Sequence, residues 1–258
     1  APAFAQEDAP FTGGYVGVSV GYDFQPEDGG QILFDRNLDG TFGDLVTTGA
    51  GANAFSPGFC NGAARTNAPA GGCKNDKDGI SYSLRAGYDW QSGSMVVGAV
   101  AEIGKSDIRD SVTGYSTTPA SYTMTREVDY LAALRGRVGF AGDRTLFYGT
   151  AGIAYANLDN SFTTTNTANG FSQRGKDSAW GAQFGGGVEH RLGESFSVGL
   201  EFLHTQLIDD NYRVRAGNSG TTPATNPFLL GNVNGTDFKR SDDRFRSNSV
   251  KLSANYRF

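Results

Sequence analysis

Apolar and polar side chains alternate along much of this chain, most clearly in the segment 249–258. Its apolar positions are Val250, Leu252, Ala254, Tyr256 and Phe258, and Ser, Lys, Asn and Arg residues lie between them. A period of two is that of a β-strand with one apolar and one polar face. It recurs in seven earlier segments, at about residues 14–24, 80–91, 95–108, 122–140, 145–158, 176–192 and 196–208. The sequence therefore predicts eight strands, each as long as the ~9 to 11 residues that a tilted strand needs to cross a bilayer.

The connections between these strands alternate in length. Short connections fall at 92–94, 141–144 and 193–195, and long ones fall at 25–79, 109–121, 159–175 and 209–243. Short turns on one side and long loops on the other are typical of bacterial outer-membrane barrels. We therefore predict an all-β fold over residues 11–258, a single eight-stranded antiparallel up-and-down transmembrane β-barrel with short periplasmic turns and long extracellular loops.

Composition agrees with a barrel and argues against other classes. The chain has no apolar run of 18 residues, which excludes a membrane-spanning helix. A mean hydropathy of -0.37 is compatible with a barrel, because only every second residue of its strands meets lipid. A net charge of -5, without basic runs that contain aromatic residues, argues against nucleic-acid binding. The small residues in 1–10 suggest a processed or flexible N-terminal segment, left after export by a signal peptide not present in this chain.

Alternation alone does not say which face points inward, since a lipocalin-like soluble barrel shows the same period with an apolar lumen. Side-chain size favours the transmembrane arrangement, because an eight-stranded interior is just wide enough for side chains and the polar face here is rich in Gly and Ser. Charged groups inside a narrow lumen must pair with one another. The predicted lumen charge network consists of Arg85, Asp89, Glu102, Asp129, Arg135, Arg137, Glu189, Arg191, Glu201, Lys251 and Arg257. A solvated outer face of a lipocalin-like protein is the alternative.

Three segments carry a family resemblance: residues 11–17 (FTGGYVG), residues 83–88 (SLRAGY) and the end at Phe258. They resemble small α-proteobacterial outer-membrane barrels related to the OmpA transmembrane domain, the opacity proteins and the 25 and 31 kDa surface antigens. The resemblance implies a porin-like integral protein of the bacterial outer membrane, in contact with lipid and lipopolysaccharide, linked in a few relatives to haem, and not an enzyme. Tyr256 and Phe258 match the aromatic positions of the signal read by the barrel-assembly machinery.

The aromatic residues of the apolar face are expected in two girdles, one at each membrane interface. The girdle near the periplasm would contain Trp90, Phe140, Phe147, Phe196, Tyr256 and Phe258, and the outer one Tyr22, Phe24, Tyr82, Tyr155 and Trp180.

The first long loop contains a pattern of oxygen ligands suited to Ca²⁺. Asp35, Asn37 and Asp39 occupy positions 1, 3 and 5, Gly40 follows, and Thr41 supplies a carbonyl. Val46 replaces the bidentate Glu of an EF-hand, so Asp44 would have to substitute for it. The alternative is an Asp/Asn/Gly turn whose side chains hold its own backbone.

The two cysteines and two histidines are the remaining candidates. Cys60 and Cys73 have no neighbouring His, so we predict a structural disulfide in an oxidising compartment, which stabilises a loop of this length by about 3 kcal/mol. It would close a Gly/Ala/Asn/Pro stretch that has little to build a core. His190 and His204 share the apolar parity; a haem ligand is one reading, and an interfacial histidine is the preferred one.

Three functions remain open at this point. The preferred one is a structural or surface-interaction role, in which the long loops contact a host or environmental ligand. A small diffusion channel is the second, and it should conduct poorly if the lumen charges pair. A calcium-binding or haem-binding surface protein is the third.

Overall fold

The computed structural model describes residues 9–26, 29–175 and 178–258, and its long strands form a closed barrel. The barrel strands are β1 (Gly13–Phe24), β6 (Gly79–Ser92), β7 (Met95–Ser106), β9 (Ala120–Ala141), β10 (Thr145–Thr164), β12 (Ser178–Arg191), β13 (Phe196–Ile208) and β16 (Arg244–Arg257). Each pairs antiparallel with the next, and β16 pairs with β1 to close the barrel. This confirms the predicted eight-stranded antiparallel fold. The predicted start of the sixth strand, at 176–177, lies outside the described residues.

The apolar face points outward and the polar face points into the lumen. Leu84, Leu134 and Leu200 are 63%, 54% and 46% exposed on the outer surface, whereas Arg135 and Glu201 are 1% and 2% exposed inside. The lipocalin-like alternative is therefore wrong. Among the described residues, no helix is long and apolar enough to span a membrane.

One prediction about the faces is wrong, and a β-bulge explains it. Along β9 and β10, Asn157 pairs with Tyr130 and Leu158 pairs with Val128, so Asp129 has no partner in the ladder. An extra residue shifts the side-chain parity of everything beyond it. As a result Val128 is buried inside, and Asp129 lies on the outer surface with Lys105. Asp129 therefore does not belong to the lumen charge network.

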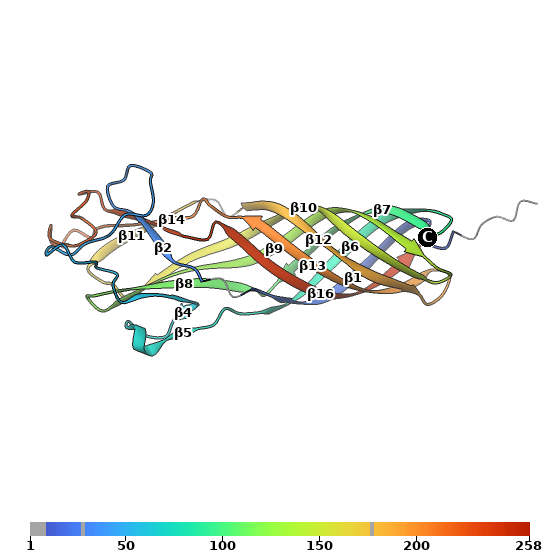
Figure 1. Cartoon of the computed structure of the whole chain (residues 1–258), viewed down its shortest axis with the longest axis horizontal. Coiled ribbons are helices and arrows are strands. Elements are labelled where there is room, and N and C mark those ends of the chain that lie inside the picture. Colours follow the sequence, from blue (N-terminus) through green and yellow to red (C-terminus); the bar gives the residue numbers. More distant parts are fainter. Residues whose placement is uncertain (1–8, 27–28, 176–177) are drawn as a thin grey trace, which may run out of the picture.

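The predicted long loops contain further strands that extend the barrel at one end (Figure 1). β8 (Arg109–Ser116) pairs with the outer half of β9, and β3 (Gly58–Asn61) pairs with β8. β11, β14, β15 and β2 form a second sheet in that order. Their bounds are Asn169–Arg174, Arg213–Asn218, Thr236–Arg240 and Ile32–Asp35. Two short strands, β4 (Ala63–Ala64) and β5 (Cys73–Lys74), flank the 3-10 turn η1 (Pro69–Gly71).

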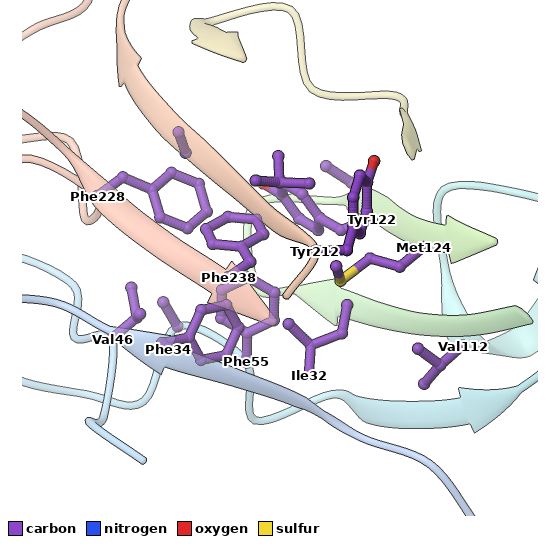
Figure 2. Packing of buried hydrophobic residues seen from close by; sticks show 14 residues of the cluster. Ile32, Phe34, Val46, Phe55, Val112, Tyr122, Met124, Tyr212, Phe228 and Phe238 are labelled. Atoms are coloured by element: carbon purple, nitrogen blue, oxygen red, sulfur yellow. The ribbon is translucent and has the colours of Figure 1, made fainter. Parts of the chain in front are cut away.

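We call this extension the cap: it consists of the second sheet, β3, β4, β5, β8 and the parts of β9 and β10 beyond the bulge. The cap has its own hydrophobic core (Figure 2). Phe238 is fully buried and packs against Phe34, with ring centroids 5.1 Å apart, and against Phe228, at 5.2 Å. Phe55 and Tyr122 complete the centre of this aromatic cluster. The first long connection contributes Phe34 and Phe55 to this core, whereas none of the described residues between Cys60 and Cys73 belongs to it.

Candidate functional site

The lumen is filled by charged side chains in two layers. The first, which we call the middle layer, consists of Arg85, Glu102, Arg135, Glu201, Lys251 and the hydroxyl of Tyr148. Glu102 accepts from Lys251 Nζ at 2.5 Å, from Arg85 Nη2 at 2.7 Å and from Arg135 Nη2 at 2.9 Å. Glu201 lies 2.8 Å from Arg85 Nη2 and accepts from the Tyr148 hydroxyl at 2.9 Å. Two carboxylates thus hold three cations in the centre of the barrel.

The second group, the periplasmic layer, consists of Asp89, Arg137, Glu189 and Arg257. Arg137 donates from Nε to Asp89 at 2.7 Å and from Nη1 to Glu189 at 3.0 Å. Arg257 Nη2 lies 2.8 Å from Asp89 and 2.9 Å from Glu189. Two arginines and two carboxylates therefore form a neutral, closed set. Gly98 leaves room for it, because a Cβ there would lie 2.0 Å from Asp89 Oδ1.

Aromatic rings join the two layers. The guanidinium of Arg137 lies 4.9 Å from the ring centroid of Tyr15 and 5.0 Å from that of Tyr148, and Arg257 lies 4.7 Å from Tyr15. Tyr148 donates to the middle layer and contacts the periplasmic one. The space left on the outer side of the middle layer is a cavity of only about 20 Å³, about the volume needed for one water molecule. Side chains therefore nearly fill the lumen at this level.

Arg191 does not join the lumen network. Its side chain is half-buried and donates to the carbonyl oxygens of Gly193 and Glu194, in the turn that follows β12. Its parity agrees with the prediction, but it lies at the end of its strand, where the carbonyls of the turn are its partners. Arg191 therefore belongs to the periplasmic rim and not to the ion pairs inside.

A third charge cluster, which the sequence did not reveal, closes the outer end of the barrel. This mouth cluster consists of Asp110, Arg126, Asp209, Arg240 and Asp242. Asp110 accepts from Arg126 Nε at 2.6 Å and from Arg240 Nη2 at 2.7 Å, and Arg126 also reaches Asp242 at 3.3 Å. Burial would raise the pKa of Asp110, but the two arginines outweigh it and hold that pKa below its usual value. Four of these residues lie in predicted loops, where no period marks them.

The candidate calcium loop uses its oxygen atoms on its own backbone. Asp35 accepts from the amides of Asp39 at 3.2 Å and Gly40 at 2.8 Å, and Asp39 accepts from the amide of Thr41 at 2.7 Å. Asn37 accepts from the amide of Asp39, and Asp44 accepts from the amide of residue 36. Backbone and side-chain hydrogen bonds from Thr41 and Asn37 lower the pKa of Asp39. Within the described ranges, no group of three or more metal-binding side chains is found. The geometry favours the turn alternative, so calcium binding is unsupported.

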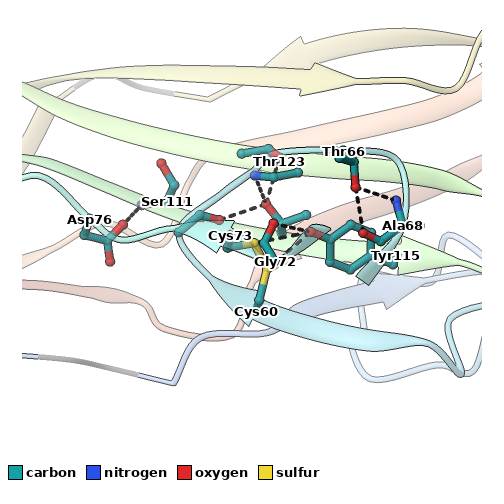
Figure 3. The surroundings of a disulfide bond; sticks show 12 residues. Cys60, Thr66, Ala68, Gly72, Cys73, Asp76, Ser111, Tyr115 and Thr123 are labelled. Atoms are coloured by element: carbon teal, nitrogen blue, oxygen red, sulfur yellow. Dashed lines mark hydrogen bonds between the residues drawn. A yellow bond between two sulfur atoms is a disulfide. The ribbon is translucent and has the colours of Figure 1, made fainter. Parts of the chain in front are cut away.

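The predicted disulfide is present in the cap (Figure 3). Cys60 and Cys73 are bonded, with Cα atoms 6.3 Å apart. Cys60 lies on β3, which pairs with β8, and Cys73 lies on β5. The bond therefore ties β3 to β5, beside the hydroxyl of Tyr115. Asp76 follows and accepts from the amide of Ser111 at 2.7 Å. The bond therefore holds the β4–β5 hairpin against β3 within the cap.

The two histidines lie apart on the outer surface. The ring of His190 is exposed at the periplasmic end and pairs through Nδ1 with Thr145 Oγ1 at 2.9 Å. The ring of His204 pairs with Asn248 Oδ1 at 2.9 Å and packs against Phe184, with ring centroids 5.0 Å apart. The structure does not bring the two histidines to one site, and their interfacial role stays a prediction.

The aromatic residues of the barrel surface lie in contact at both expected levels. Phe196 packs on Tyr256 at one end, with centroids 5.2 Å apart, and Tyr155 packs on Trp180 at the other, at 4.9 Å. Tyr256 and Phe258 are 46% and 76% exposed, so both rings face outward. Their role as an assembly signal stays a prediction.

Comparisons with known proteins agree with this geometry. The family described as the outer membrane protein beta-barrel domain matches residues 1–258. The 31 kDa outer-membrane immunogenic protein of Brucella melitensis is 24% identical, over 100% of this chain and 88% of the relative. The 22 kDa outer membrane protein of Rhizobium leguminosarum is 25% identical, over 70% of this chain and 77% of the relative. Among solved structures, OprG of Pseudomonas aeruginosa has a similar fold, with a TM-score of 0.51 and 12% identity over 96% of this chain and 97% of that one.

Proposed function

This chain belongs to the outer membrane protein β-barrel domain family, and we propose that it acts as a closed surface protein whose folded cap contacts the environment of the cell. The observation that supports this role is the division of the molecule into a blocked barrel and a cap with its own core. A barrel filled by two layers of ion pairs serves as an anchor. The cap, which all four long connections build, presents the surface available to a host or environmental ligand.

The barrel surface is proposed to contact outer-membrane lipid and lipopolysaccharide. Support comes from the outward-facing apolar side chains between the two aromatic levels. We also propose that the role is not catalytic. The four carboxylates of the two lumen layers, Asp89, Glu102, Glu189 and Glu201, are each held by arginine or lysine, so they are not available as general acids or bases without the loss of those ion pairs.

The surface role is tested by a variant in which short turns replace the four cap connections while the eight strands are kept. Cells that display the native protein should adhere to host or environmental surfaces more strongly than cells that display the variant. Heat-modifiable mobility on gels serves as the control that the shortened barrel still folds. Equal adhesion by both kinds of cell would contradict a role for the cap.

The diffusion-channel alternative predicts an open lumen that conducts ions, whereas the surface role proposed here predicts a closed one. If the middle and periplasmic layers block the lumen as proposed, the native protein should show little or no steady single-channel current in planar bilayers. Large, stable currents from the native protein would contradict the blocked lumen and favour the diffusion channel.

A further inference from the structure

A pocket of about 210 Å³ opens in the cap beside the turn that joins β8 to β9. All four long connections contribute to its wall, through residues 54–55, 116–120, 165–168 and 226–228. These segments are far apart in the sequence and meet only because the cap folds as one unit. A cavity that every connection helps to build is a candidate binding site in the part of the protein that faces the environment.

The floor of this cap pocket is aromatic and rigid. Tyr122, Phe55 and Phe228 line it, and each is less than 5% exposed. The ring centroids of Phe55 and Tyr122 are 5.2 Å apart, and those of Tyr122 and Phe228 are 5.7 Å apart. The three rings belong to the cap core shown in Figure 2. Their positions are therefore fixed before any ligand arrives, which reduces the entropic cost of binding.

The edge of the pocket carries amides whose orientation is also fixed. Asn166 Nδ2 donates to the Tyr122 hydroxyl at 2.9 Å and to Asn169 Oδ1 at 3.0 Å, while Asn166 Oδ1 accepts from the amide of Ala168 at 2.8 Å. Asn226 Nδ2 donates to Asn169 Oδ1 at 3.1 Å. Other lining residues carry hydroxyl groups: Ser116, Thr117, Thr118, Thr165 and Thr167. Each residue that lines the pocket is uncharged.

We propose that the cap pocket binds one uncharged sugar ring at the end of a glycan; this proposal rests on the surface role proposed above. A ligand with a full charge would lose hydration against a wall that offers no counter-charge. A pyranose presents an apolar C–H face to the bottom of the pocket, and its hydroxyls pair with the threonine hydroxyls of the edge and with the Asn226 Nδ2 hydrogen that does not go to Asn169.

The size of the pocket supports a single ring. Its volume equals that of about seven water molecules at ~30 Å³ each, and it is smaller than the ~300 to 1,000 Å³ of sites for drug-sized ligands. An extended peptide would instead need a free strand edge or a long groove. The pocket is lined by turns and by the end of the β8–β9 hairpin, which provide neither.

The test uses saturation-transfer NMR on the full chain in a detergent without a sugar headgroup. The probes are methyl glucoside, methyl galactoside, methyl mannoside and N-acetylglucosamine. We expect transfer to the ring protons of at least one probe. A Thr167→Trp variant, which places a bulky ring at an exposed residue of the pocket wall, should weaken this transfer by about tenfold.

The matched control is Thr41→Trp, the same substitution at an exposed threonine that does not line the pocket. It should leave the transfer unchanged, and both variants should keep heat-modifiable mobility. The proposal is overturned if the native protein shows no transfer to any of the four probes, or if Thr167→Trp leaves the transfer unchanged. Either of these results together with cap-dependent adhesion would remove the sugar pocket and leave the surface role standing.

Discussion

At the scale of single residues, the lumen shows how position decides the energetic weight of an ion pair. Asp89 is fully buried and holds both Arg137 and Arg257. Asp129 forms one pair with Lys105 on the outer surface, where the two side chains are 48% and 57% exposed. A buried pair cannot lose one partner without leaving an uncompensated charge away from water. When an exposed pair loses one partner, water hydrates the remaining charge, so the loss costs little.

We therefore predict that Asp89→Asn lowers the free energy of unfolding by about 3–5 kcal/mol, because two arginines would share the single charge of Glu189. The control is the same substitution at the exposed site, Asp129→Asn, which should lower it by about 1 kcal/mol or less. Denaturant unfolding in micelles measures both values. Similar losses for the two variants would show that the periplasmic layer does not carry this stability.

A second prediction at this scale concerns pH. Burial and the nearby negative charge of Asp110 raise the pKa of Asp76 in the cap to about 6 from the usual 3.8. The folded cap thus retains a proton that the unfolded chain has released, so the stability of the cap should fall as pH rises from about 4 to about 6 and then level off. Amide hydrogen exchange of the cap, corrected for the intrinsic rate at each pH, measures this. Asp76→Asn should remove that part of the pH dependence, and a cap that gains stability over this interval would refute the assignment.

At the scale of elements, the bulge in β9 sets the faces of the cap. On the barrel side of the bulge, Arg135 and Arg137 point inward. On the cap side, Arg126 points inward only because Asp129 adds one residue to the strand. In a ladder without the bulge, one half of β9 would present its charged side chains to lipid or to the cap core.

Deletion of Asp129 is accordingly predicted to disrupt the mouth cluster, because it would turn Arg126 away from Asp110 and Asp242. Limited proteolysis should cut the cap of the deletion variant much faster than the native cap. Asp129→Ala keeps the extra residue and should retain native resistance. Rapid cleavage of Asp129→Ala would mean that the side chain, and not the length of the strand, matters.

At the scale of the whole molecule, the protein has two separately packed halves along one axis (Figure 1). The barrel lumen contains the ion-pair layers and an apolar cluster that includes Val128, Leu158 and Phe245, and its outer surface is apolar, whereas the cap is built around the apolar core at Phe238. Long strands such as β9 and β10 run through both halves and hold them in line. Because the cap has its own apolar core, its stability is expected to depend mainly on contacts within the cap and on few contacts with the lumen.

Phe238→Ala tests this division. Loss of a buried Phe side chain should destabilise the cap by about 3–5 kcal/mol, because a cavity would remain among Phe34, Phe55 and Phe228. The variant should become sensitive to protease in the cap and still show heat-modifiable mobility of the barrel. The lipid-facing substitution Phe140→Ala, at a ring that is 64% exposed, is the control for the loss of a phenyl group. Loss of heat-modifiability in Phe238→Ala would show that the two halves fold as one.

The sequence by itself determined the barrel: the strands, the short turns, the inward and outward faces except beyond the bulge in β9, and most of the charges in the lumen. This was possible because a period of two is a local property of a strand, and Arg85, Arg137 and Glu201 follow it directly. The sequence does not reveal the bulge, because Val128 and Tyr130 continue the apolar spacing of β9. Only the pairing with β10 shows the shift.

Only the tertiary structure decided the cap and the mouth cluster. The contacts of Phe34 with Phe238 and of Arg126 with Asp242 join residues more than a hundred positions apart. Phe34 lies in the first long connection and Phe238 and Asp242 lie in the fourth, where the spacing is not regular, and Arg126 lies on β9 beyond the bulge. Long-range packing therefore decided what the local pattern could not: the segments predicted only as long loops form a folded unit with a core and a pocket of its own.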